Sequence, residues 1–161
     1  MRQIGKALLV VLLAGLAACS HAMIANTPIP DTGENRQVLD VLAKYKLAVE
    51  AKDLDAVLQL VSADYMDVTV PGRAVDPQDF AGIKAALSKE FERTKSLHLE
   101  VHPRNVRVEG NEANVDYFYV VRFDPIMPNA NNTDSKWHSE PDDGRLRLRK
   151  QNGQWKIVSG L

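Results

Sequence analysis

The chain has 161 residues, of which 45% are hydrophobic and 25% charged, and its formal net charge is −1. This length suits one domain of ordinary size, and the balanced charge excludes a protein whose main role is to coat nucleic acid, since that role needs a cationic excess. The single cysteine, Cys19, excludes an internal disulfide framework and any metal site built from several cysteines, so we expect no metal and no other cofactor.

The first residues have the pattern of an export signal. Arg2 and Lys6 are followed by the apolar run 7–18, whose twelve residues are too few to span a bilayer. The run ends in Leu16-Ala17-Ala18-Cys19, which resembles the lipobox of bacterial lipoproteins. The resemblance implies that residues 1–18 are removed as a signal peptide and that the new N-terminus is acylated.

Lipidation at Cys19 implies attachment to a membrane of the cell envelope. Because Ser20 rather than aspartate follows the cysteine, the resemblance points to the outer membrane. Residues 19–32 contain two prolines and no apolar periodicity, so they are predicted to be a flexible tether. An ordinary secretory signal cleaved near Ala22 or Ala25 is the alternative.

Three helices are predicted next, because apolar residues recur there at helical spacing. These stretches are 38–49, 54–61 and 80–91. Asp31 or Thr32 can cap the first helix, and Asp53 can cap the second. Asp76-Pro77 predicts the start of the third, because proline suits the first position of a helix.

After Thr94 the apolar period changes to two, which predicts strands. The expected strands are 97–102, 106–108, 113–123, 145–150 and 155–158. The stretch 113–123 is apolar on both faces in its middle, so it is predicted to be a central, covered strand. Asn152-Gly153 predicts a tight hairpin, and residues 124–143 are expected to form a long rim loop.

Helices followed by antiparallel strands indicate the α+β class. Residues 45–71 and 144–159 resemble the opening and the final hairpin of the nuclear transport factor 2-like, or SnoaL-like, superfamily. The resemblance implies one domain over residues 33–161. Three N-terminal helices would pack there on a strongly curved mixed or antiparallel sheet, and this cone would enclose a pocket.

The pocket of such a cone is expected to be lined by apolar and aromatic side chains of the helices and strands. The predicted lining residues are Tyr45, Val49, Phe80, Phe91, Tyr117, Tyr119 and Trp155. Homodimerisation through the open face of the sheet is common in this superfamily and is compatible with the apolar strands of this chain.

Some enzymes with this cone, the ketosteroid isomerases, use a tyrosine as oxyanion donor and an aspartate as proton carrier. Tyr45 matches the position of that tyrosine, but Val70 stands before Pro71, where the proton-carrying aspartate would be. Without a base, general acid–base catalysis loses its proton acceptor. The remaining candidate partners of Tyr45 are Asp67 and His98.

Two further patterns have a polar or charged face. In His98-x-Glu100-x-His102 the histidines would lie roughly 13 Å apart on a strand, too far for one tetrahedral zinc ion. Arginines at 145, 147 and 149 form a basic row that could hold an anion. The simpler partners for this row are cross-strand acidic residues, and the candidates are Glu100, Glu112 and Asp116.

The sequence therefore predicts a lipid-anchored cell-envelope protein whose cone-shaped domain binds a small apolar or amphiphilic molecule, or a partner protein, without catalysis. One alternative is an enzyme of the isomerase, dehydratase or cyclase type that uses Tyr45 with Asp67 or His98. Another is a structural envelope module whose hollow is filled by side chains. Nucleic acid is not an expected partner.

Overall fold

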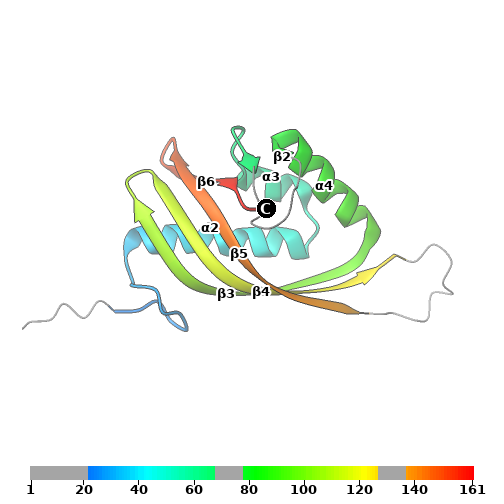
Figure 1. The fold of residues 1–161 in the computed structure, drawn as a ribbon, viewed down its shortest axis with the longest axis horizontal. Helices are drawn as coiled ribbons and strands as arrows, with labels where there is room; N and C mark the ends of the chain where they lie inside the picture. Colours follow the sequence, from blue (N-terminus) through cyan, green and yellow to red (C-terminus); the bar gives the residue numbers. More distant parts are fainter. Residues whose placement is uncertain (1–21, 68–77, 127–136) are drawn as a thin grey trace, which may run out of the picture.

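The computed structural model describes three stretches of the chain, residues 22–67, 78–126 and 137–161. In these stretches, three helices pack on a four-stranded antiparallel sheet, and a second sheet of two short strands lies beside them (Figure 1). The helices are α2 (Gly33–Glu50), α3 (Leu54–Leu60) and α4 (Phe80–Arg93). The strands are β1 (Met66–Asp67), β2 (Gln78–Asp79), β3 (Thr94–Glu109), β4 (Glu112–Pro125), β5 (His138–Gln151) and β6 (Gln154–Ser159). The predicted α+β class is confirmed.

Each described helix begins at a side chain that caps its first turn. Thr32 caps α2 by accepting a hydrogen bond from the Asn35 N–H at 3.1 Å. Asp53 caps α3, as predicted. α4 is capped by Asp79, so it begins later than predicted, and Asp76-Pro77 lies outside the described residues. None of these helices is long and apolar enough to cross a membrane.

The four-stranded sheet has the order β3-β4-β5-β6, in which every strand pairs with its neighbour in the sequence. The predicted hairpin between β5 and β6 is confirmed, and Asn152 and Gly153 both have the positive φ that a tight hairpin requires. The predicted rim loop is too long, because β4 continues to Pro125 and β5 begins at His138. Residues 138–143 pair with 118–123 of β4, and this pairing overrides their low strand propensity.

The sheet is strongly curved, and its long strands bend around α2 (Figure 1). β-bulges interrupt the pairing between Thr94 and Ser96 and between Pro103 and Asn105 in β3. A further irregularity lies opposite Arg147 and Leu148 of β5, where Val158 is the extra residue of β6. A bulge adds an unpaired residue to one strand and bends it, so these three sites are the local sources of curvature.

One face of the sheet builds the core with α2. Val38 of α2 and Val115, Leu146 and Ile157 of the strands are at most 1% exposed. β4 is a central strand, as predicted, but the described helices cover only one of its faces. Phe118, on the other face, is half-buried. This outer face is therefore open in the monomer.

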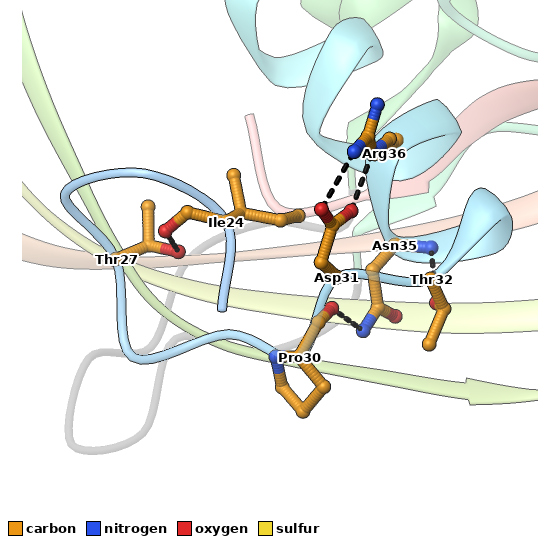
Figure 2. Close-up of polar contacts among 7 residues, drawn as sticks. All are labelled: Ile24, Thr27, Pro30, Asp31, Thr32, Asn35 and Arg36. Carbon is orange, nitrogen blue, oxygen red and sulfur yellow. Dashed lines mark hydrogen bonds and ion pairs between the residues drawn. The ribbon is translucent and has the colours of Figure 1, made fainter. Parts of the chain in front are cut away.

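A short loop before α2 is held against the domain (Figure 2). Met23 and Pro30 form an isolated β-bridge, and Ile29 is 1% exposed. The Pro30 carbonyl accepts a hydrogen bond from Asn35 Nδ2 at 2.8 Å, and Asp31 forms an ion pair with Arg36 (Figure 2). The stretch expected to be a flexible tether is thus fixed from Ala22 onward, because burial of Ile29 and these polar contacts hold it.

Candidate functional site

A cavity of about 890 Å³ lies between the C-terminal half of α2, β4, β5 and residues 159–161. β6 pairs with β5 only from Arg147 to Gln151, so no described strand pairs with the second edge of residues 138–146. The cavity extends around this edge, from the concave face of the sheet to its outer face. Its volume lies within the range of about 300–1,000 Å³ that is typical of small-molecule sites.

Three tyrosine side chains line the cavity on the concave face. Tyr45 comes from α2, and Tyr117 and Tyr119 come from β4, where residues two apart point to the same face. The ring centroids of Tyr117 and Tyr119 are 5.8 Å apart. Within the described parts of the chain, none of the three hydroxyls has a hydrogen-bond partner. Val49, one helical turn after Tyr45, and Val121 add apolar wall.

Gly144 allows the Tyr117 ring to lie flat on the neighbouring strand. The two residues are directly paired across β4 and β5. A Cβ at position 144 would overlap the ring and would lie 2.7 Å from the Tyr117 hydroxyl oxygen. Sequence reasoning did not select this residue, although an isolated glycine in a strand is a known sign of close approach.

The phenols of the cavity are held in their neutral form. Burial, with a smaller contribution from neighbouring tyrosines, raises the pKa of Tyr45 to about 12. Burial also raises the pKa of Tyr117 and of Tyr119 above the ordinary value of about 10. At neutral pH these groups are therefore hydrogen-bond donors and acceptors rather than anions.

Asp67 lines the same cavity as Tyr45, which a pairing of these two residues requires. Its carboxylate accepts a hydrogen bond from the Gly160 N–H at 3.0 Å and lies 3.4 Å from the Tyr65 hydroxyl, which donates to it. Tyr65 is 1% exposed, and burial raises its pKa to about 12. No local pattern in the sequence points to Tyr65, because its backbone partner Leu161 is distant along the chain.

The cavity also reaches charged side chains on the outer face. Arg104 pairs with Asp143 at 2.7 Å, and Arg145 pairs with Asp116. The predicted cross-strand partner Asp116 is therefore confirmed, and Glu112 likewise pairs with Arg149. The third candidate, Glu100, instead pairs with Arg122 at 2.7 Å.

His98 lies outside the cavity. Its Nδ1 is 2.6 Å from Glu50 Oε1, and its side chain is 51% exposed. His102 stacks on Phe118 on the outer face. Among the described residues, no group of three or more His, Cys, Asp or Glu side chains could hold a metal ion.

The other predicted lining residues occupy different places. Phe80 and Phe91 belong to α4, and Phe91 is buried in the core. Trp155 lines a second cavity, of about 760 Å³, between α2, α3 and the β5–β6 hairpin. Its Nε1 is buried and has no hydrogen-bond partner in the described structure. The structure thus brings together Tyr45, Val49, Tyr117 and Tyr119, and it separates them from Phe80, Phe91 and Trp155.

No protein-family model and no curated protein matches the sequence. Solved structures match the fold at low identity. A conserved protein from Planctomyces limnophilus is 14% identical, with a TM-score of 0.66 and coverage of 79% of this chain and 92% of that one. A nuclear transport factor 2-like superfamily protein from Salmonella enterica is 12% identical, with a TM-score of 0.63 and coverage of 78% and 86%.

A third similar structure carries the name of an enzyme. It is a provisionally named dehydratase of the nuclear transport factor 2-like family from Streptomyces avermitilis. It is 13% identical, with a TM-score of 0.64, and the match covers 79% of this chain and 93% of that one. Identities this low establish the fold alone. The chain therefore has the nuclear transport factor 2-like fold that its sequence predicts.

Proposed function

We propose that the protein binds a small amphiphilic molecule in the cavity between α2 and the concave face of the sheet. The observation that carries this proposal is the set of three neutral phenols whose hydroxyls have no described partner. These hydroxyls are not fully buried, so water can bond to them, and the polar atoms of a ligand can replace that water. A ligand with an apolar body and polar atoms would satisfy the hydroxyls and cover the apolar wall.

The test is native mass spectrometry of the purified full chain, with a variant that fills the cavity. Val121→Trp adds bulk to the cavity wall, whereas Leu47→Trp adds the same side chain at an exposed site on α2 and is the control. We expect a co-purifying small molecule in the wild type and in the control, and its loss in Val121→Trp. A wild type without a bound molecule, or retention in Val121→Trp, would contradict the proposal.

An enzyme is the second candidate, because Asp67 and Tyr45 line one cavity and a similar structure is named a dehydratase. Two observations favour binding alone. The Asp67 carboxylate bonds to Gly160 and Tyr65, and His98 contacts Glu50 outside the cavity. We expect no turnover of hydroxy-carbonyl compounds, and turnover that disappears in Tyr45→Phe would establish the enzyme. The cavity volume, well above about 300 Å³, argues against a purely structural module.

We propose further that Cys19 carries the lipid that anchors this domain to the outer membrane. The support is the Leu16-Ala17-Ala18-Cys19 motif behind a short apolar run. These residues lie outside the described part of the chain. Cys19→Ala should move the protein from the membrane fraction to the soluble fraction. Continued membrane association of the variant would disprove the anchor.

The outer face of the sheet is the surface we propose for a homodimer. Phe118 is half-buried there between His102, whose ring stacks on it, and Arg104, which lies 5.2 Å from its ring centroid. Sedimentation of the Cys19→Ala protein should show a dimer, and Phe118→Asp should convert it to a monomer. A monomeric parent protein would rule out this interface.

A further inference from the structure

The charges around the cavity are divided between the two faces of the sheet. The three arginines that line it are Arg104, Arg145 and Arg147. Arg104 lies over the Phe118 ring on the outer face and pairs with Asp143. Arg145 pairs with Asp116. Two of the three positive charges are therefore neutralised on the outer face, away from the phenols.

On the concave face, the charged side chains that line the cavity are acidic. Asp142 is the direct partner of Tyr119 across β4 and β5, so both project to the same side. Asp67 lies on this side as well, where it accepts the Gly160 N–H. After burial, Asp142 and then Glu140 are the main causes that raise the pKa of Tyr119. Negatively charged side chains thus lie near this phenol.

The aromatic groups of the same wall attract positive charge too. Tyr117 is 7% exposed, lines the cavity and has no described hydrogen-bond partner for its hydroxyl. Its ring lies 5.8 Å from that of Tyr119, and Tyr45 faces the cavity from α2. Tyrosine faces attract cations, and several together recognise alkylammonium groups.

We infer that the molecule bound in this cavity is an organic ammonium ion that carries an apolar group. The inference rests on the proposed binding function and names its ligand class. The carboxylates of Asp67 and Asp142 would balance the positive charge, and the three tyrosine rings would contact the ammonium group and the apolar body. Among the described residues that line the cavity on this face, an anionic ligand would meet two carboxylates and no basic side chain.

Arg147 is the third arginine that lines the cavity, and it adds no positive charge to the concave face. It alternates with Leu146 and Leu148, which are buried on the concave face, so its side chain projects to the outer face. Its partner across the sheet is the neutral Asn114. An anion held by Arg147 would therefore lie on the far side of β5 from the phenols.

The test compares three probes of similar size that differ in charge. 2-Phenylethylammonium is the cation, 2-phenylethanol the neutral compound and 3-phenylpropionate the anion, each titrated into the full chain by calorimetry or NMR. We expect the cation to bind at least about tenfold more tightly than either other probe. Asp67→Asn combined with Asp142→Asn should remove this preference, so that the cation binds no more tightly than the neutral probe.

Each of the single variants Asp67→Asn and Asp142→Asn is matched by Asp40→Asn, which also removes one negative charge, at an exposed ion pair with Lys44 on α2. This control should keep the preference for the cation. Equal or tighter binding of the neutral or anionic probe would overturn the ammonium inference and leave the binding function intact. If none of the probes binds and the chain co-purifies with no molecule, both the inference and the proposed function fail. The single variants Asp67→Asn and Asp142→Asn replace the double variant if it does not fold.

Discussion

A residue without a side chain shapes the wall of the cavity. Gly144 leaves the space that the Tyr117 ring occupies, and the two residues are paired across the sheet. Gly160 has a similar restriction, since its φ is +101° and a Cβ there would overlap the Arg145 carbonyl. Both glycines hold the concave wall in a form that side chains at these positions would disturb.

Gly144→Ala should displace the Tyr117 ring from the strand. We expect a loss of about 1–3 kcal/mol in the free energy of unfolding, as for other overpacked sites, together with weaker binding of the cavity ligand. Urea unfolding and ligand titration measure these effects. Gly33→Ala is the control, because no atom lies within 4 Å of a Cβ at this first position of α2. It should be neutral or slightly stabilising. An unchanged stability of Gly144→Ala would show that the ring relaxes freely.

At the scale of elements, Glu50 joins the end of α2 to the edge strand β3. Its carboxylate accepts hydrogen bonds from Lys46 Nζ at 2.6 Å and from the Leu99 N–H at 2.9 Å, and His98 Nδ1 lies 2.6 Å away. Burial acts to raise the pKa of Glu50, but these hydrogen bonds and charges outweigh it and lower the pKa. The contact also occupies a strand N–H that would otherwise be open to pairing with another chain.

Glu50→Ala should destabilise the protein by about 1–3 kcal/mol, because the backbone N–H of the buried residue Leu99 loses its acceptor. Since the folded pKa of Glu50 is lowered, its contribution is present above the unfolded value of about 4.3 and is lost as the pH falls further. Urea unfolding at several pH values measures both effects. Asp40→Ala, at an exposed ion pair, should cost less than about 1 kcal/mol. Equal costs for the two variants would contradict the role of Glu50.

Local signals in the sequence were sufficient for several elements. Asp53 as a helix cap and Asn152-Gly153 as a hairpin depend on neighbouring backbone groups alone, and both predictions are confirmed. The start of α4 depends on a distant strand instead. Gln78 and Asp79 pair with β1 in an extended conformation, so the helix cannot begin before Phe80. The start of β5 likewise has no local signal, because it depends on pairing with β4.

For the site, the sequence indicated which residues are apolar but not which hollow each of them borders. Tyr117 and Tyr119 line one cavity, and Trp155 lines another on the far side of α2. Apolar periodicity is the same in both cases, since it reports burial alone. Apolar periodicity predicts a loop at Asp142, and only the pairing of this residue with Tyr119 in the sheet places it on the concave face.

At the scale of the whole molecule, neutral buried phenols make stability depend on pH in alkaline solution. The pKa of Tyr45 and of Tyr65 is raised to about 12, against about 10 in an unfolded chain. The unfolded state therefore loses these protons first, so the contribution of these phenols to stability is constant below about pH 10 and falls as the pH rises toward 12.

Urea unfolding between pH 9 and 12, with the phenolate absorbance followed in parallel, measures this loss. Tyr45→Phe and Tyr65→Phe should each make the fall less steep than in the wild type, because one phenol no longer titrates. Slopes equal to that of the wild type would show that these tyrosines ionise freely in the folded protein.

If Cys19 is acylated as proposed, the loop of Figure 2 limits how far the domain can stand from a bilayer. Only three peptide steps separate Cys19 from Ala22, whose carbonyl accepts the Asp31 N–H. At about 3.3–3.6 Å per residue, a chain of this length reaches roughly 10 Å at full extension. With Cys19 acylated, the start of α2 would be held close to the lipid headgroups. The domain could then not move far from the membrane. A ligand of the proposed cavity would then be captured at the membrane surface.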